Sequence, residues 1–181
     1  MPVDFLYDSL AMDIAQTRTA LDTENGANAE RRDVRHMRIF LDMDGVVVDF
    51  NKFRAISGLT GDEVKKIPGA YLDMDPIPGA LEGVRSLIGM GHEVWLATKP
   101  PTGIPQAYAD KVAWVLRYLP ELKRRIILTH DKSLLLGDVL IDDRPHKANA
   151  EKFEGVLIKF GGNIDWPFVL RELRGNHGHS R

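Results

Sequence analysis

An apolar run that ends in two closely spaced acids is the feature that most constrains this chain. Residues 37–41 read MRIFL and are followed directly by Asp42, Met43, Asp44 and Gly45. A short run of β-branched and aromatic residues that stops at acids and glycine is typical of a strand in the interior of a parallel sheet. We therefore predict a strand that delivers Asp42 and Asp44 at its carboxyl end.

The rest of the chain alternates strand-like and helix-like patterns. The strand-like runs are HEVWLAT, RRIILTH, DVLIDD and GVLIKFGG, and the helical patterns cover 79–88, 106–118 and 166–173. This alternation predicts an α/β fold with a mostly parallel sheet flanked by helices, in which ligands bind at the carboxyl ends of the strands.

Composition shifts along the chain suggest its division into parts. Residues 1–36 form a polar N-terminal extension, to which we assign no chemistry, and residues 37–175 form the α/β domain. Several glycines and prolines interrupt 50–77, which suits a small helical cap inserted after the first strand. The polar end at 176–181 is expected to be mobile.

Composition also narrows the class of protein. The 181 residues carry a net charge of -2 and no cysteine, so disulfides, thiolate metal sites and cysteine nucleophiles are excluded. The near-neutral charge lacks the basic face of a nucleic-acid binder, and no run approaches the ~20 apolar residues of a membrane helix. The first residues lack the pattern of a secretory signal. We expect a soluble cytoplasmic protein that binds neither a nucleic acid polymer nor a membrane.

The spacing of the acids points to a metal ion. Asp42 and Asp44 can face one site as the chain leaves the sheet, and crowded carboxylates repel each other unless a cation intervenes. Mg²⁺ prefers oxygen ligands, and Asp142 or Asp143, at the end of DVLID, would supply a third acid. The alternative is that such acids only cap turns.

Two more polar residues fall at or just beyond strand ends. Alone, Thr98 reads as an ordinary strand-end residue and Lys132 as a solvated surface lysine. Their order along the chain, between DMDGV and the acid pair of DVLIDD, resembles that of the haloacid dehalogenase superfamily of phosphohydrolases. The resemblance implies a Rossmann-like fold with a small cap and Mg²⁺-dependent phosphatase chemistry.

The resemblance also implies a role for each residue. Asp42 would attack phosphorus and form an aspartyl phosphate, and Asp44 would protonate the leaving alkoxide and then deprotonate the water that cleaves the intermediate. Thr98 and Lys132 would bind the phosphate, since phosphoryl transfer needs fixed positive charge around the phosphate oxygens. The implied metal ligands are Asp42, Asp44 and Asp142, with Asp143 in the outer shell.

A narrower resemblance covers roughly residues 38–147. LDMDGVVVDF, PGAYLDMDPIPGALEGV, DKVAWVLRYL and ILTHDKSLLLGDVLIDDRP are similar to the 5'(3')-deoxyribonucleotidases, a family with cytosolic, mitochondrial, bacterial and phage members. It implies a nucleoside monophosphate substrate, Lys111 as a phosphate contact, and Phe50 and Tyr71 as aromatic contacts to the base. On their own, Lys111 reads as a helix-surface residue and the two aromatics as packing within the cap.

Some residues depart from the family pattern. Lys99 follows Thr98 where relatives usually have a serine, which adds a cation beside the phosphate or sugar, so we count Lys99 among the phosphate-binding residues. His130 stands where an arginine is common, and we count it among the base-binding residues. Ala70 replaces a second aromatic. These changes leave the base preference open.

Three functions stay open from the sequence. The first is a nucleotidase acting on deoxyribonucleoside or ribonucleoside monophosphates. The second is the same reaction on another small phosphomonoester, such as a sugar phosphate, and the third is a non-catalytic nucleotide-binding module. The expected partner is a small phosphomonoester, and a homodimer is left open. The sequence contains no G-x-S-x-G or G-x-x-x-x-G-K-[ST], which argues against a serine hydrolase and a P-loop ATPase.

Overall fold

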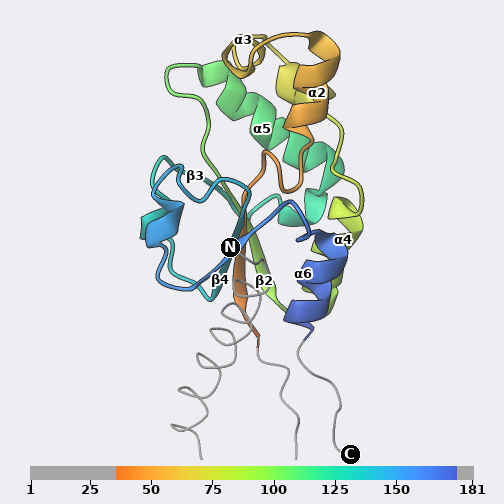
Figure 1. Cartoon of the computed structure of the whole chain (residues 1–181), viewed down its shortest axis with the longest axis vertical. Coiled ribbons are helices and arrows are strands. Elements are labelled where there is room, and N and C mark those ends of the chain that lie inside the picture. Colours follow the sequence, from red (N-terminus) through yellow and green to blue (C-terminus); the bar gives the residue numbers. More distant parts are fainter. Residues whose placement is uncertain (1–35, 175–181) are drawn as a thin grey trace, which may run out of the picture. The chain divides into compact units, whose positions relative to one another are not determined.

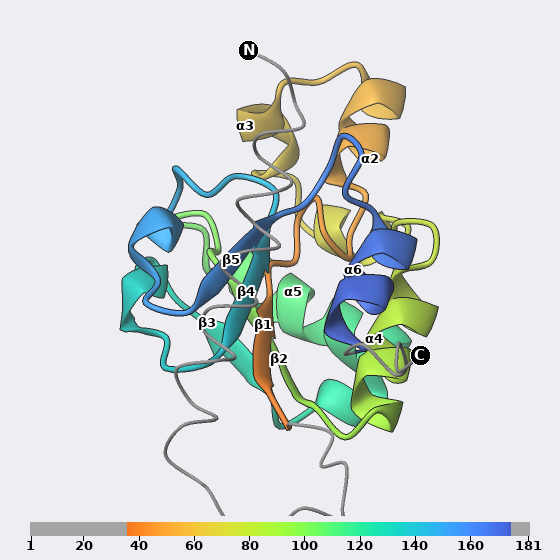
Figure 2. The ribbon, with the colours of Figure 1, turned by 60° about the horizontal axis from the view of Figure 1, so that its bottom comes forward.

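A five-stranded, all-parallel sheet forms the centre of the computed structural model, which describes residues 36–174. The predicted tail and, apart from His36, the predicted N-terminal extension lie outside the described residues. The strand order is β3-β2-β1-β4-β5 (Figures 1 and 2), so the predicted α/β fold is confirmed. The strands are β1 (Arg38–Leu41), β2 (Glu93–Thr98), β3 (Ile126–Leu128), β4 (Val139–Asp142) and β5 (Val156–Lys159).

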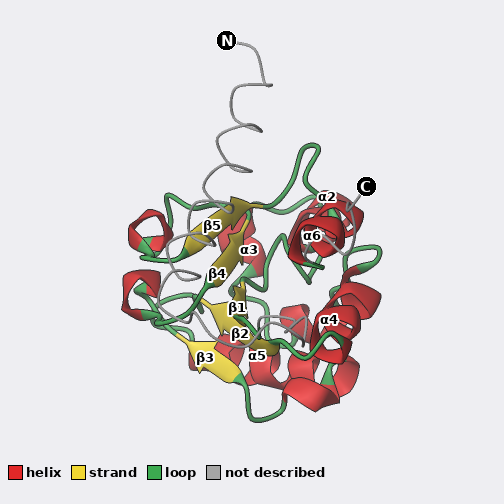
Figure 3. Ribbon diagram, turned by 90° about the horizontal axis from the view of Figure 1, so that it is seen from below, coloured by secondary structure: helices red, strands yellow, loops and turns green. Residues whose placement is uncertain are grey.

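The two faces of the sheet are covered differently. Ile39 and Leu41 belong to the larger hydrophobic cluster, together with residues of the long helices, whereas Phe40 belongs to a smaller cluster on the opposite face. The larger cluster packs under three helices and the smaller one under two 3₁₀ turns (Figure 3). The helices are α4 (Ala80–Gly89), α5 (Pro105–Tyr118) and α6 (Trp166–Leu173), and the turns are η3 (Lys132–Leu134) and η4 (Ala150–Lys152). A further 3₁₀ turn, η2 (Pro120–Leu122), follows α5.

The chain between β1 and α4 forms an insertion beyond the carboxyl ends of the strands (Figure 1). Asp49 caps its first helix, and Thr60 caps the second through a capping box with Glu63. The predicted cap at 50–77 contains all three short elements, α2 (Phe50–Ser57), α3 (Gly61–Val64) and η1 (Ala70–Asp73). Within the described part of the chain, no helix combines the length and the apolar character that crossing a bilayer requires.

Candidate active site

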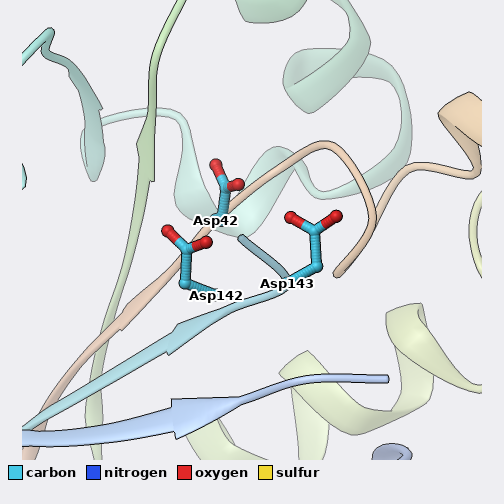
Figure 4. A group of neighbouring side chains, drawn as sticks. All are labelled: Asp42, Asp142 and Asp143. Atoms are coloured by element: carbon cyan, nitrogen blue, oxygen red, sulfur yellow. The ribbon is translucent and has the colours of Figure 1, made fainter. Parts of the chain in front are cut away.

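Three carboxylates meet where β1 and β4 end. These strands are parallel neighbours, so the residues that follow them emerge at the same edge of the sheet. Asp42, Asp142 and Asp143 each offer an oxygen, and these three atoms lie within 4.8 Å of one another; Figure 4 shows the side chains together. The third acid of this group is Asp143, whereas the predicted ligand set included Asp44. The ligand set itself stays a prediction.

The Lys132 ammonium lies between two of these acids. Its Nζ is 2.5 Å from Asp142 Oδ2 and 3.0 Å from Asp42 Oδ1. The residue is only 2% exposed, which excludes the alternative of a solvated surface lysine. Burial lowers the pKa of Lys132, but the two carboxylates raise it by more, so the pKa lies above its usual value. Lys132 therefore carries a fixed positive charge beside Asp42.

A second buried ammonium joins the other predicted residues. Lys111 Nζ, on α5, lies 2.6 Å from Asp44 Oδ1 and 3.2 Å from Thr98 Oγ1. It also lies 4.3 Å from the centroid of the Tyr71 ring, in cation–π geometry. Lys111 is 0% exposed, so it is not the helix-surface residue that its sequence position alone suggested. The pairing explains why the Asp44 carboxylate stands apart from the three-acid group.

The turn after β1 is fixed from two directions. Gly45 has φ 85°, and a Cβ on it would overlap the Asp143 carboxylate, so glycine suits both the backbone and the space. On the other side, Trp166 Nε1, from α6, donates to the Val46 carbonyl at 3.0 Å. The position of Asp44 is thus set by the last helix as well as by the strand before it.

Asp143 and Arg144 complete the charged group. The pKa of Asp143 is raised to about 6, chiefly by burial; Arg144 opposes the rise, and the charges of Asp42 and Asp142 add to it. Arg144 Nε lies 3.3 Å from Asp143 Oδ2. Sequence reasoning missed Arg144, although its position directly after the acid pair was a usable signal.

The residues predicted to contact the rest of the substrate are less closely gathered. Phe50 is 9% and Tyr71 1% exposed, with ring centroids 6.3 Å apart, and burial raises the pKa of Tyr71. His130 is exposed, and its Nε2 lies 2.9 Å from Tyr108 Oη. Lys99 is exposed as well. Within 36–174, no hydrogen bond or ion pair links Lys99 or His130 to the acids at the strand ends.

The acids and the lysine at the strand ends can bind a cation and an anion side by side. Oxygen ligands gathered within a few ångströms suit a hard divalent cation. Lys132 holds positive charge next to the Asp42 carboxylate, where an incoming anion would otherwise be repelled. Such a site can bring an anionic group and a nucleophilic carboxylate together.

Comparisons with known proteins find relatives named as deoxyribonucleotidases. The chain is 33% identical over 144 residues to the human cytosolic-type 5'(3')-deoxyribonucleotidase, covering 61% of this chain and 72% of the relative. A putative 5'(3')-deoxyribonucleotidase of Vibrio phage KVP40 is 34% identical over 145 residues, covering 75% and 83%. One from Bordetella bronchiseptica is 44% identical over 79 residues, covering 43% of this chain and 42% of the relative.

A family model adds the strongest evidence. The model described as "5' nucleotidase, deoxy (Pyrimidine), cytosolic type C protein" matches residues 64–171, which is more than half of the chain. That range contains α4, α5, most of α6 and four of the five strands. The chain therefore belongs to this family of 5'-nucleotidases, which are phosphatases of the haloacid dehalogenase superfamily.

Proposed function

We propose that this protein is a Mg²⁺-dependent phosphomonoesterase that hydrolyses deoxyribonucleoside or ribonucleoside monophosphates through an aspartyl phosphate on Asp42. The observation that carries the proposal is the position of the Asp42 carboxylate, which contacts the Lys132 ammonium and lies beside the acids Asp142 and Asp143. Family membership supports the reaction class, and the named relatives support the nucleotide substrate.

The donor atoms of the site fit Mg²⁺, because they are carboxylate oxygens that lie within 4.8 Å of one another. Asp42, Asp142 and Asp143 would hold the ion, and Asp44 would contribute its backbone carbonyl, since its carboxylate is paired with Lys111. When bound, the cation supplies positive charge that offsets the repulsion between the phosphate and the acids.

The residues of the chain divide the reaction between them. An Asp42 oxygen attacks phosphorus in line, and the bond to the nucleoside oxygen breaks as Asp44 gives that oxygen a proton. Asp44 then takes a proton from water, which attacks phosphorus, releases phosphate and restores the Asp42 carboxylate. Lys132 and the Thr98 hydroxyl bind phosphate oxygens during both steps, and they remain in place without reorganising because both are buried.

The nucleoside would extend from the strand ends toward the insertion. Phe50, Tyr71 and His130 stay the proposed contacts to the base, and Lys99 and Lys111 the proposed additional cations for the phosphate. The proposed compartment is the cytoplasm, and the proposed partner is a small phosphomonoester, without a nucleic acid polymer. A homodimer stays an expectation from the sequence.

One observation favours the second candidate, a non-nucleotide phosphomonoesterase. Phe50 and Tyr71 are 9% and 1% exposed, so their faces are mostly covered in this conformation and offer little stacking surface to a base. In that case the site would keep the same phosphate chemistry and accept a smaller group, such as a sugar phosphate.

A phosphate-release assay on a panel of phosphomonoesters with Mg²⁺ tests the proposal. The panel includes deoxyribonucleoside and ribonucleoside 5'- and 3'-monophosphates and several sugar phosphates. We expect the highest kcat/KM on nucleotides. If sugar phosphates are hydrolysed as well as nucleotides, the second candidate replaces the first.

The nucleophile is tested by Asp42→Asn, which should lower kcat by at least about 10³-fold while the fold survives. Asp73→Asn, at an exposed acid in the insertion, is the matched control and should keep full activity. Acid quenching during turnover should trap phosphate on the wild-type protein and none on Asp42→Asn. Full activity of Asp42→Asn would rule out the mechanism.

A further inference from the structure

Asp110 is a buried carboxylate that the proposed mechanism does not use. It lies on α5 and is 2% exposed. Its oxygens accept hydrogen bonds from Gly69 N at 2.8 Å and from Gln106 Nε2 at 2.7 Å. Among the described residues, no basic side chain forms an ion pair with it. Burying a carboxylate costs free energy unless it gains partners, so the position calls for a role beyond filling space.

The hydrogen bond to Gly69 holds the start of η1. Gly69 precedes this turn with φ 81°, and η1 carries Tyr71. One helical turn beyond Asp110, Trp114 Nε1 donates to the carbonyl of Met74, which ends η1, at 2.9 Å. Side chains on one stripe of α5 therefore fix both ends of η1.

The position of η1 matters because η1 carries Tyr71, which contacts the Lys111 ammonium. The Tyr71 ring lies 4.3 Å from the Lys111 ammonium, and Lys111 is the neighbour of Asp110 in sequence. The same ammonium contacts Asp44 and Thr98. A lysine has four rotatable bonds, so a ring fixed on one side of its ammonium limits where that ammonium lies.

We propose that Asp110 is a positioning residue for the phosphate site, whose buried carboxylate holds Gly69 so that Tyr71 keeps the Lys111 ammonium against Asp44 and Thr98. The proposal rests on the proposed function, in which Asp44 and Thr98 act on the phosphate. Asp110 itself touches no substrate. Without the hydrogen bond to Gly69, η1 moves, the Lys111 ammonium is less confined, and the site binds phosphate less tightly.

The test compares Asp110→Ala, which removes the acceptor, with Asp110→Asn, whose Oδ1 still accepts from Gly69 N. In Asp110→Asn, the Gln106 amide can rotate and present its oxygen to the new amide group. Gln106→Ala is the matched control, because it removes the exposed partner and leaves the contact to Gly69. Two quantities are measured with Mg²⁺ present: the binding constant of inorganic phosphate by calorimetry, and kcat and KM on the best substrate.

For Asp110→Ala we expect phosphate affinity to fall about tenfold and KM to rise with it, while Asp110→Asn and Gln106→Ala stay within about twofold of wild type. Tyr71→Leu should give the same loss of phosphate affinity as Asp110→Ala, and the double variant should lose little more, because both act on phosphate through Lys111. Unchanged phosphate affinity in a folded Asp110→Ala protein would overturn the proposal. A loss in Asp110→Asn equal to that in Asp110→Ala, or additive losses in the double variant, would overturn it as well.

The calorimetric measurement of phosphate binding distinguishes a failure of this inference from a failure of the proposed function. If the wild-type protein hydrolyses no phosphomonoester but binds inorganic phosphate, and Asp110→Ala weakens that binding, the proposed function fails and the positioning role stands. If the protein is a nucleotidase and Asp110→Ala binds phosphate normally, the positioning role alone fails. If Asp110→Ala does not fold, Tyr71→Leu and Asp110→Asn test the proposal in its place. Unchanged phosphate affinity in Tyr71→Leu, or a loss of about tenfold in Asp110→Asn, overturns the proposal.

Discussion

The strand-end cluster and the α2–α3 segment lie at the same end of the molecule but are built in opposite ways. The strand-end cluster consists of Asp42, Asp44, Lys111, Lys132, Asp142 and Asp143. Five of its six members are buried, and acids pair with lysines at 2.5 to 3.0 Å. The α2–α3 segment, residues 50–64, has only two buried residues, Phe50 and Val64.

Because of this difference in burial, the strand-end cluster tolerates fewer substitutions than the α2–α3 segment. A buried charge that loses its partner destabilises the fold strongly, whereas an exposed side chain contributes little. Ile56, for example, is 77% exposed in the segment. Residues of the cluster are therefore constrained by stability as well as by chemistry. Those of the segment are free to vary, and a change of substrate preference at such positions costs the fold little.

The largest effect is expected when one lysine of the cluster loses its charge. Lys132→Met leaves the buried Asp42 and Asp142 carboxylates without their cation, so the free energy of unfolding should fall by about 3–5 kcal/mol. Urea unfolding without Mg²⁺ measures this. Lys52→Met, which breaks the exposed 2.8 Å pair with Asp75 beside the segment, should leave the urea midpoint unchanged. Equal effects of the two substitutions would remove the contrast between the regions.

Two glycines with positive φ give a matched pair for the next prediction. Gly58→Ala, at φ 68° with nothing within 4 Å of the added Cβ, should cost about 1–2 kcal/mol of backbone strain and leave kcat/KM unchanged. Gly45→Ala adds an overlap with the Asp143 carboxylate, so kcat/KM should also fall about 100-fold. Urea unfolding and steady-state kinetics check both. Normal activity of Gly45→Ala would show that this turn is not part of the site.

A smaller contrast is expected inside the segment itself. Val64 is 0% exposed, so Val64→Ala should lower the free energy of unfolding by about 1–3 kcal/mol. Ile56→Ala should change it by less than about 0.5 kcal/mol and leave KM unaltered. A raised KM for Ile56→Ala would mean that this exposed side chain contacts the substrate.

The smallest effect concerns pH and lies away from both regions. His92 is 3% exposed, and burial lowers its pKa below the ordinary 6.5. His92 therefore binds a proton at a higher pH in the unfolded chain than in the folded protein. As a result, the free energy of unfolding should fall as the pH drops through 6.5 toward the lowered pKa. His92→Gln should show a weaker fall in urea unfolding between pH 7 and pH 5 and keep its activity. An unchanged pH dependence would assign the effect to other groups.

The sequence predicted the fold and the meeting of the acids because both follow from short-range patterns. Parallel strands share one carboxyl edge, so Asp42 and Asp142 had to emerge near each other once the strands were recognised. The burial of Lys111 was missed, although it stands four residues after Ala107 and four before Val115, on the buried face of α5.

Other contacts had no signal to find. The hydrogen bond between Asp110 and Gly69 joins a side chain to a backbone amide 41 residues away, and no periodicity marks such a pair. The covering of Tyr71 and Phe50 likewise depends on how the insertion packs, which residue spacing in an irregular stretch does not specify.

The central place of β1 in the sheet has a consequence for how the protein is made. Both neighbours of β1 are synthesised after it, and Arg38 N donates to Asp138, 100 residues further along the chain. Among the described strands, β1 is synthesised first, and it has partners on both sides only once β4 (Val139–Asp142) has been made. Such a high contact order slows folding and leaves an apolar strand exposed on the nascent chain. Pairing of the strand that delivers Asp42 and Asp44 is therefore complete only after β4 has been synthesised.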